Sequence, residues 1–376
     1  MPVAEELRRR GAQVWAAVAG PAVSIWLNEC SVETLSHADN VSLHEAQKAL
    51  NDHETDVVLS ASGLYNQIEH TFRLAARRLE ISIVAVLDSW TNYAERFERL
   101  NNGTVVTSHP DEVCVMDDLT YEGMLAAGFE KEQLKLTGPP NLESSLRFHK
   151  EKGAKHRAAW RREHSVMPDD LLFLFFSEPF STGPDGEHFE GPGAIIGADG
   201  ESIFGYTSID ILSAVLEELD SECQAADAKC KLIIKPHPSE YADGLMPLVE
   251  ECRLSHVDPT ICTDGNAAHW IAVADAVVGM MSIALLEAAL AGKPSLSVQL
   301  GLLESGEDDP CLGNVIGYTY PIYDRSTLRR ALRSVCTGDV EGVTPSPDHP
   351  LRIEGAALRV AGVVEGSKPR RAVGQA

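Results

Sequence analysis

Residues 232–238 read Leu-Ile-Ile-Lys-Pro-His-Pro. The apolar start is typical of a buried β-strand, and the two prolines fix the turn that ends it. Ligands of open α/β sheets bind at the carboxyl ends of the strands, so Lys235 and His237 are expected at a binding edge. His237 can donate a hydrogen bond to a phosphate and, when protonated, neutralise a leaving nucleotide. The alternative is a rigid turn whose histidine has no function.

A second motif lies within residues 274–294, where an apolar strand ends at Gly279 and a helix begins at Ser282. Gly279 lets the backbone approach a ligand closely, and the free amides near Met281 and Ser282 favour a phosphate. Ser282 is equally well explained as the helix N-cap. Glu287 lies among apolar helix residues, where a carboxylate needs a partner, either ribose hydroxyls or a lysine or arginine.

Strand-like and helix-like segments alternate along the chain, which predicts an α/β protein with parallel sheets covered on both faces. The length of 376 residues fits two domains. We expect an N-terminal domain over 1–145, a second domain over 146–345 and a partly disordered tail over 346–376. The expected strands are 56–60, 81–87, 112–116, 134–136, 171–176, 231–235, 276–278 and 295–298.

The N-terminal end departs from the usual order of a doubly wound domain. Such a domain opens with a strand that leads into a glycine-rich turn. Residues 1–7 instead have the pattern of a helix, with Pro2 in its tolerated first turn, and the next strand is expected at 14–18. The sequence therefore predicts an N-terminal domain that lacks its first strand.

Asp88 follows the apolar run 81–87 and is therefore expected at the carboxyl end of a strand. A carboxylate there can deprotonate an acceptor hydroxyl. Trp90 and Tyr93 can stack on a sugar, and Arg96 lies in the same segment as a further acceptor-side candidate. The alternatives are that Asp88 caps the next helix and that both aromatic side chains belong to the core.

A second candidate base lies on the preceding helix. Glu69 and His70 follow the small-residue turn 60–63, which contains Ser62. A satisfied pair on the protein surface is the simpler interpretation of Glu69 and His70. The turn and the helix add Ser62 and Glu69 to the candidates for the acceptor side.

These motifs resemble the nucleotide-binding half of GT-B glycosyltransferases and of the related hydrolysing UDP-N-acetylglucosamine 2-epimerases. The His237-Pro238 pair with the later Ser282 is also similar to bacterial sialyltransferases and capsule sugar transferases. The resemblance implies two Rossmann-like domains, with His237 and Ser282 contacting the donor phosphate and Glu287 binding ribose. Residues 137–140, Thr-Gly-Pro-Pro, resemble the element that ends the N-terminal domain in this superfamily.

The leading expectation is a metal-independent glycosyltransferase of polysaccharide biosynthesis. It would move a sugar from a UDP- or CMP-sugar, which is a substrate rather than a cofactor, to a sugar or small-molecule acceptor. An epimerase or hydrolase of the nucleotide sugar and a non-catalytic nucleotide-sugar-binding protein stay open as alternatives. No cofactor is expected, and a homodimer is compatible with the sequence.

Composition limits the partners and the compartment. The net charge of −24 would repel the phosphates of a nucleic acid, so nucleic-acid binding is not expected. The eight cysteines contain no C-x-x-C pair, which favours buried free thiols in a reducing compartment. Because no apolar run is long enough to cross a bilayer and no signal peptide opens the chain, we expect a cytoplasmic protein. No metal site is expected, since His237 has no ligand at zinc spacing and Asp117-Asp118 and Asp308-Asp309 look like solvated charges.

Residues 177–202 are rich in Gly and Pro and follow the buried strand 171–176. A loop that begins at the carboxyl end of a strand can reach the ligand-binding edge of the sheet. The segment is therefore predicted to be either a lid that excludes water from a bound donor or a disordered surface insertion.

Overall fold

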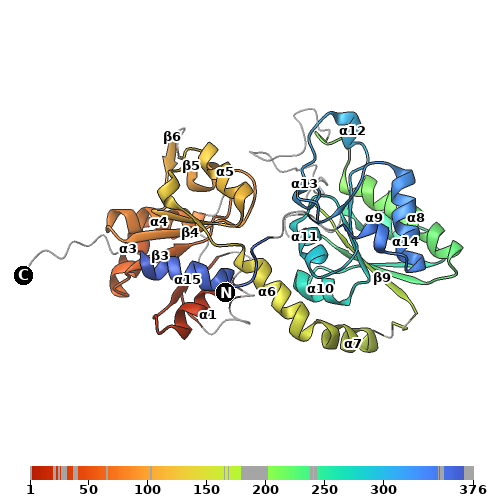
Figure 1. Cartoon of the computed structure of the whole chain (residues 1–376), viewed down its shortest axis with the longest axis horizontal. Coiled ribbons are helices and arrows are strands. Elements are labelled where there is room, and N and C mark those ends of the chain that lie inside the picture. Colours follow the sequence, from red (N-terminus) through yellow and green to blue (C-terminus); the bar gives the residue numbers. More distant parts are fainter. Residues whose placement is uncertain are drawn as a thin grey trace, which may run out of the picture. The chain divides into compact units, whose positions relative to one another are not determined.

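The structure is a computed structural model, and the chain falls into two compact units (Figure 1). Unit 1 comprises Met1–Ser144 and Leu351–Ala376, and unit 2 comprises Ser145–Pro350. The predicted lid lies almost wholly outside the residues that the structure describes. The described residues are 2–19, 23, 26, 32–36, 41–64, 67–101, 104–164, 166–167, 169–178, 202–237, 240, 244–345, 347 and 351–367.

Unit 1 is built on a four-stranded parallel sheet in the order β3-β4-β7-β8. Its strands confirm the four predicted from the first half of the sequence. Ser60 pairs with Ala85 and Val86 pairs with Cys114, so the carboxyl ends of neighbouring strands lie at one edge. The strands are β3 (Val57–Ser60), β4 (Ser82–Val86), β7 (Glu112–Val115) and β8 (Leu134–Leu136).

Helices cover both faces of this sheet. They are α3 (Leu43–Asp52) and α4 (Gln67–Arg78) on one face, and α1 (Pro2–Arg9) and α15 (Ala356–Gly366) on the other. Phe72 of α4 is buried in one cluster with Ile83 of β4. The next residue of β4, Val84, points to the opposite face and is buried with Leu7 of α1 and Val360 of α15.

The C-terminal segment differs from the expected tail, because residues 351–367 complete unit 1. The Arg359 guanidinium donates hydrogen bonds to the backbone carbonyl oxygens of Thr137 at 2.7 Å and Arg352 at 2.8 Å. The carboxylate of Glu143 accepts from the backbone N–H groups of Gly355 and Ala357. The Gly- and Pro-rich composition of this segment favoured disorder, but α15 gains its stability from the apolar face that it buries on α1 and β4.

Two small sheets stand apart from the main sheet of unit 1. β1 (Trp15–Ala17) pairs in parallel with β2 (Glu33–Ser36), and α1 precedes both strands, as the sequence predicted. β5 (Glu98–Asn101) and β6 (Thr104–Thr107) form an antiparallel hairpin that the sequence did not predict. The other helix of unit 1 is α5 (Asp118–Ala126), and α6 (Pro140–Phe148) runs from unit 1 into unit 2.

Unit 2 contains a six-stranded parallel sheet in the order β11-β10-β9-β12-β13-β14. β9 is the first strand of the unit, and the chain places the next two strands on one side of it and the last three on the other. Such a reversal of strand order opens a crevice at the carboxyl ends of the central strands. The strands are β9 (Leu171–Phe176), β10 (Cys230–Lys235), β11 (Val257–Ile261), β12 (Ala276–Gly279), β13 (Ser295–Val298) and β14 (Tyr320–Ile322).

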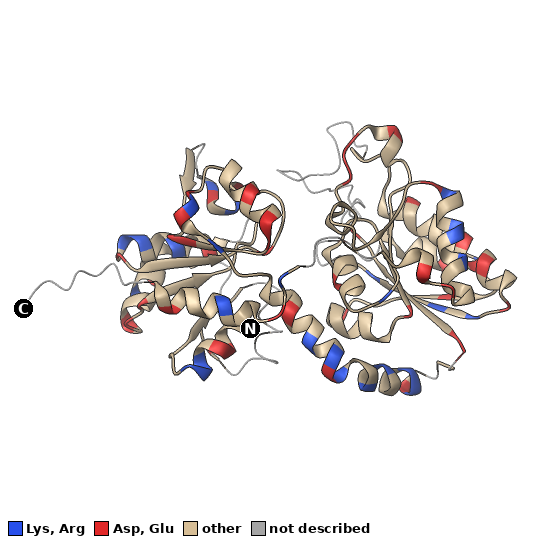
Figure 2. Ribbon diagram, viewed as in Figure 1, with Lys and Arg blue, Asp and Glu red and all other residues tan. Residues whose placement is uncertain are grey.

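Alternate residues of β9 point to opposite faces of the sheet, and both faces are covered. Phe173 and Phe175 pack under α8 (Ser208–Ala225) and α14 (Arg325–Thr337). Leu172 and Leu174 pack under α10 (Ala267–Val273) and α11 (Ile283–Leu290). Basic side chains gather on α7 (Ala154–Glu163) (Figure 2). The remaining helices are α9 (Met246–Glu251), α12 (Leu302–Ser305) and α13 (Leu312–Val315).

Two expectations from composition can be compared with the structure. The seven cysteines that the structure describes are free thiols, of which Cys114, Cys223, Cys230 and Cys311 are buried. Every helix in the described ranges is too short or too polar to cross a lipid bilayer.

Docking of the C-terminal segment on unit 1 is tested by two glycine substitutions. Gly138 and Gly128 both have positive φ, +84° and +91°. A Cβ added to Gly138 would lie 1.9 Å from the carbonyl oxygen of Arg352, whereas a Cβ added to Gly128 would have no atom within 4 Å. We expect Gly128→Ala to cost about 1 kcal/mol and Gly138→Ala about 2–4 kcal/mol in the free energy of unfolding, measured by urea denaturation. Equal costs would contradict the described packing.

Candidate functional site

The carboxyl ends of β9, β10 and β12 meet at the point in unit 2 where the strand order reverses. Ser177 follows β9, His237 follows β10, and Ser282 follows β12. Gly279 allows this close approach, because a Cβ at that position would lie 3.1 Å from the carbonyl oxygen of Phe176. A larger residue would push β12 away from β9, so the glycine predicted for close backbone approach has a packing role here.

Glu240 holds the turn that carries His237. Its carboxylate accepts a hydrogen bond from the Ser177 hydroxyl at 2.9 Å and from the backbone N–H of His237 at 3.3 Å. Burial lowers the pKa of His237 below its usual value, so the half-buried imidazole is neutral at pH 7. A neutral imidazole can donate one hydrogen bond to a phosphate oxygen without adding a charge.

Ser282 caps α11, as the simpler interpretation of the sequence held. Its hydroxyl accepts from the backbone N–H of Ala284 at 3.4 Å, and its carbonyl oxygen accepts from that of Leu285 at 3.0 Å. Among the described residues the first-turn amide of Ile283 has no such partner and can bind a ligand. The partly buried Met281, at the same turn, packs against the apolar clusters on both faces of the sheet.

Glu287 has found a partner other than a basic side chain. Its carboxyl group accepts a hydrogen bond from the Ser145 hydroxyl of α6. Burial raises the pKa of Glu287, and the hydrogen bond from Ser145 opposes that shift. Among the described residues no ion pair reaches Glu287, so the lysine or arginine bridge considered from the sequence is not present there.

Lys235 lies away from Gly279 and Ser282. Its ammonium group donates hydrogen bonds to the backbone carbonyl oxygens of Thr263 and Asp264, both at 2.6 Å. Burial lowers its pKa. In this structure the lysine fastens the loop after β11, and its assignment to a nucleotide stays a prediction.

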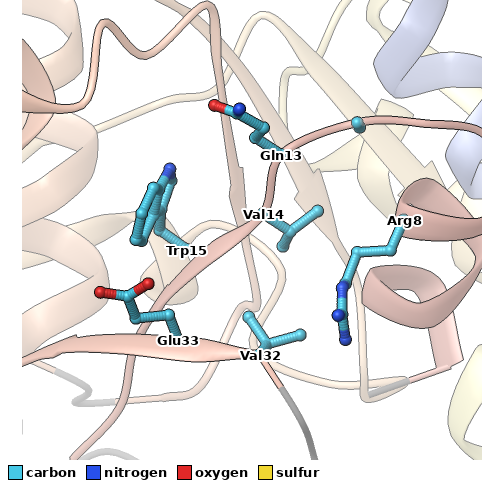
Figure 3. Close-up of a pocket in the computed structure, with 7 residues that line it drawn as sticks. Arg8, Gln13, Val14, Trp15, Val32 and Glu33 are labelled. Carbon is cyan, nitrogen blue, oxygen red and sulfur yellow. The ribbon is translucent and has the colours of Figure 1, made fainter.

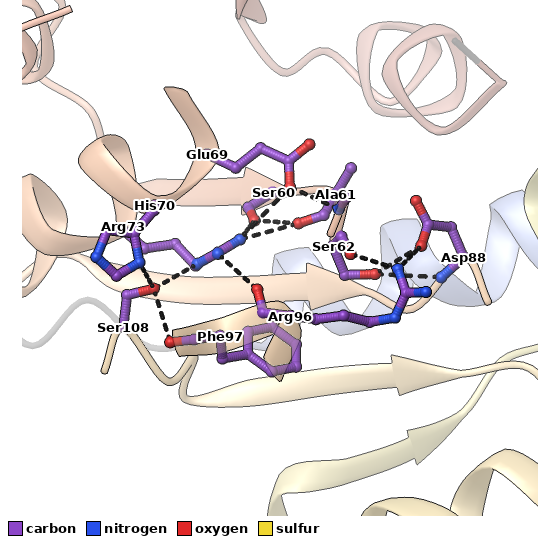
Figure 4. A network of polar contacts seen from close by, with 11 residues as sticks. Ser60, Ala61, Ser62, Glu69, His70, Arg73, Asp88, Arg96, Phe97 and Ser108 are labelled. Atoms are coloured by element: carbon purple, nitrogen blue, oxygen red, sulfur yellow. Dashed lines mark hydrogen bonds and ion pairs between the residues drawn. The ribbon is translucent and has the colours of Figure 1, made fainter. Parts of the chain in front are cut away.

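In unit 1 the strand ends bring three of the predicted acceptor-side residues together (Figure 4). One carboxylate oxygen of Asp88 accepts hydrogen bonds from the Ser62 hydroxyl at 2.9 Å and from the Arg96 guanidinium at 3.0 Å. The side chain of Asp88 is 42% exposed, whereas that of Arg96 is 7% exposed. Because Asp88 caps no helix and remains open to solvent, its carboxylate is both oriented and accessible.

Behind Asp88 lies a buried network centred on Arg73 (Figure 4). The Arg73 guanidinium is 1% exposed and donates to the hydroxyls of Ser60 and Ser108 and to the backbone oxygen of Arg96. Glu69 forms an ion pair with it at 3.6 Å and accepts from the backbone N–H of Gly63. Burial raises the pKa of Glu69 to about 7, with the charge of Asp88 adding to the shift.

The surface-pair interpretation of Glu69 and His70 is therefore wrong. His70 is buried and hydrogen bonded to Ser108 at 2.8 Å, and burial lowers its pKa to about 4. The residue pattern of this helix does not decide whether these two side chains face solvent or the core. Their burial was decided by the arginine of the next turn, Arg73, which needs polar partners once it is enclosed.

Trp90 and Tyr93 lie in the packed interior of unit 1. The buried Trp90 donates from Nε1 to the carboxylate of Asp117 at 2.6 Å. The ring of Tyr93 contacts the backbone at Gly123, where a Cβ would come within 2.2 Å of it. These contacts are those of the core alternative, and stacking on a sugar stays a prediction.

Two of the carboxylates read as solvated are structural. Asp117 caps α5 and binds Trp90. Asp309 accepts hydrogen bonds from the amide groups of Gln299 and Asn314, both at 2.8 Å, and from the Tyr323 hydroxyl. The cap of Asp117 involves Thr120, three residues on, but Trp90, Gln299 and Tyr323 lie farther away in the sequence, so the local pattern could not reveal those contacts.

Glu178 and Glu240 are the site residues that sequence reasoning missed. Glu178 is the second polar residue after six apolar residues of β9, a position where the chain leaves the sheet at its binding edge. The position of Glu178 after this strand could have identified it, but the Gly- and Pro-rich residues that follow favoured the prediction of a lid or a disordered insertion. No group of His, Cys, Asp and Glu side chains suited to a metal ion occurs within the described residues.

A pocket of about 350 Å³ lies elsewhere in unit 1, beside α1 and the β1–β2 pair (Figure 3). Its wall includes Arg8, Trp15 and Glu33, together with the apolar side chains of Val14 and Val32. None of the residues predicted for the functional site lines it. The pocket therefore gives no support to the predicted donor or acceptor sites.

Comparison with known proteins gives matches in structure alone. No family description and no curated protein matches the chain. The UDP-GlcNAc 2-epimerase of Methanocaldococcus jannaschii superposes with a TM-score of 0.65 at 13% identity over 97% of this chain and 95% of that one. The Neisseria meningitidis UDP-GlcNAc 2-epimerase bound to UDP-GlcNAc gives 0.63 at 12% identity, covering 97% and 95%. A glycosyltransferase of Rickettsia africae gives 0.52 at 10% identity, covering 98% and 89%.

These likenesses establish the fold. The predicted fold of two Rossmann-like units with parallel sheets is confirmed, and it is the fold of these 2-epimerases and of this glycosyltransferase. Identities this low carry no residue roles.

The buried carboxyl of Glu69 makes unit 1 sensitive to pH. Its folded pKa, about 7, exceeds the ordinary value of 4.5, so its contribution to stability is complete below pH 4.5 and is lost as pH rises through 7. We expect Glu69→Gln to remove about 1–3 kcal/mol of the fall in unfolding free energy between pH 5 and 8, measured in urea. The exposed Glu132, replaced by Gln, should leave the wild-type slope unchanged. Parallel slopes for wild type and Glu69→Gln would refute the assignment.

Proposed function

We propose that the chain is an enzyme that acts on a nucleotide-activated sugar, with Asp88 as the base of the reaction. The observation that carries this proposal is the exposed carboxylate of Asp88, oriented by Ser62 and Arg96 at the carboxyl ends of parallel strands. A general base must be ionised, held in one direction and reachable by its proton donor. Ser62 and Arg96 hold the carboxylate of Asp88 in one direction, and its exposure makes it reachable.

Glu69 supplies a second carboxyl group, and burial raises its pKa. With a pKa of about 7 it can exchange a proton at neutral pH, and it lies close enough to Asp88 to feel its charge. Two neighbouring carboxyl groups in unlike environments are the usual arrangement for separate acid and base roles. This pair supports chemistry that removes a proton from one position and returns one to another.

The nucleotide is assigned to unit 2. His237 and the first turn of α11 at Ser282 offer neutral hydrogen-bond donors to a diphosphate, and Glu287 offers acceptors to ribose hydroxyls. Uridine is the first base to test, because one structural neighbour holds UDP-GlcNAc. The low identity leaves the sugar itself to experiment.

Glycosyl transfer and epimerisation of the sugar ring are the two candidate reactions. The motifs favour transfer, in which Asp88 would deprotonate an acceptor hydroxyl. The pair Asp88 and Glu69, together with the 2-epimerases among the structural neighbours, favours epimerisation, in which a proton leaves a ring carbon and another is delivered. A role in polysaccharide biosynthesis stays a prediction for either reaction.

One experiment separates these reactions from simple binding. UDP-GlcNAc is incubated with the protein in D₂O, with and without a mixture of acceptor sugars, and the products are analysed by NMR. Deuterium on a ring carbon indicates epimerisation, whereas UDP released only with acceptor indicates transfer. Binding with neither product would leave a nucleotide-sugar-binding protein, and the enzyme proposal would fail.

Loss of the Asp88 carboxylate should abolish turnover and spare nucleotide binding. We expect Asp88→Asn to lower kcat by about 100-fold or more, because an amide cannot accept the proton. Affinity for UDP, measured by titration calorimetry, should stay within a few-fold of wild type. Glu95→Gln, an exposed neighbour on the same segment, is the matched control and should keep full activity.

Glu287 is tested through ribose. Glu287→Gln can keep a hydrogen bond with Ser145, so the free energy of unfolding should change little. UDP binding should weaken by about 1–3 kcal/mol, because the amide replaces one charged acceptor of the ribose hydroxyls. Ser145→Ala separates the two roles, since it removes the protein partner alone. Unchanged UDP affinity in Glu287→Gln would exclude the ribose contact.

A further inference from the structure

Glu178 is a buried carboxyl group that no described residue fully satisfies. It lies two residues beyond the end of β9, is 7% exposed, and is fixed through its backbone oxygen by the hydroxyl of Ser208 at 2.6 Å. Its Oε1 atom has no hydrogen-bond partner among the residues that the structure describes. A buried polar atom without a partner is costly and rare, which points to a group that arrives with a ligand.

The surroundings of Glu178 raise the pKa of its carboxyl group. Burial is the main cause and the negative charge of Glu240 the second, and together they raise the pKa of Glu178 to about 8, against a weaker opposing effect of a hydrogen bond with Ser282. No lysine or arginine is among these causes. At pH 7 the group is a neutral carboxylic acid, so it can donate a hydrogen bond as well as accept one.

The same group lies at the start of α11. Glu178 follows β9 and Ser282 follows the neighbouring strand β12, so the carboxyl lies near the N-cap of α11, where amide groups and the helix dipole favour an anion. Ser282 is also among the groups that affect the pKa of Glu178. Two ionised glutamates at this point would repel a phosphate. A protonated Glu178 removes one of those charges and adds a donor directed at the ligand.

We propose that Glu178 binds a phosphoryl oxygen of the nucleotide as a neutral hydrogen-bond donor, in the place where a basic side chain would otherwise serve. The inference rests on the proposed function and adds a residue and a proton to its nucleotide site. Nucleotide affinity is then coupled to one protonation event on the enzyme. Deprotonation of Glu178 places a second negative charge against the phosphate and removes the donor.

His237 and Tyr206, two titratable groups near Glu178, do not share its pH range. Glu240 lies in the turn after β10, and His237 precedes it there with a lowered pKa. Tyr206, before α8, has a pKa raised by burial and by the charges of Asp309 and Glu178. The nucleotide's last phosphate proton leaves near pH 6. Between pH 7 and 9 Glu178 is therefore the group of this set that titrates.

The test measures the Kd of UDP by titration calorimetry on the full chain between pH 7 and 9. With a pKa of about 8, the protonated fraction falls about tenfold across this range, so wild-type affinity should fall by about the same factor. Glu178→Gln stays neutral and keeps a donor, so its affinity should match wild type at pH 7 and vary little with pH. Glu217→Gln, which removes an exposed charge of α8 in the same unit, should keep the wild-type slope.

A second variant covers failure of Glu178→Gln to fold, judged by circular dichroism. Glu240→Gln removes the charge that raises the pKa of Glu178, so the loss of affinity should move to lower pH. Equal pH slopes in wild type and Glu178→Gln, or an unmoved midpoint in Glu240→Gln, overturn the role of Glu178 and leave the proposed function standing. Absence of UDP and CMP binding at every pH overturns the proposed function itself.

Discussion

Parallel strands bring all their carboxyl ends to one edge of a sheet, and both units of this protein depend on that constraint. In unit 1 it places Ser62, after β3, beside Asp88, after β4. In unit 2 it gathers the residues after β9, β10 and β12, with Gly279 letting two of those strands approach closely. Side chains far apart in the sequence become neighbours because the pairing of parallel strands fixes where the residues after each strand lie.

The protein manages buried charge differently at its two sites. Unit 1 encloses a guanidinium, Arg73, and surrounds it with hydroxyls, carbonyl oxygens and Glu69. Unit 2 encloses carboxyl groups, Glu178 and Glu287, whose described partners are serine hydroxyls rather than cations. Burial without a cation raises the pKa of a carboxyl group, so Glu178, with a pKa of about 8, is a neutral donor at pH 7 where a nucleotide phosphate is expected. This fits a chain whose net charge of −24 would otherwise oppose an anionic ligand.

Much of the fold followed from local pattern. Apolar runs of strand length identified the main strands of both units, because strands buried on both faces must be apolar throughout. β1 was expected at 14–18, whereas its partner β2 and the short hairpin β5–β6, which belong to two-stranded sheets apart from the main ones, escaped this pattern. The C-terminal helix α15 escaped it as well, because its weakly apolar face has a meaning only when α1 and β4 are present to receive it.

By itself the sequence determined the α/β class, the parallel sheets and the strand ends after which Asp88, His237 and Ser282 lie. Those features depend on hydrophobic periodicity and on turn residues, which act over a few neighbouring positions. Tertiary structure alone decided that His70 is buried and Glu69 partly buried, that Glu287 pairs with Ser145, and that Glu178 is buried. Each of these depends on contacts between segments that are distant in the sequence. The pKa of an ionisable group depends on its burial and on nearby charges, and both arise only when those segments pack together.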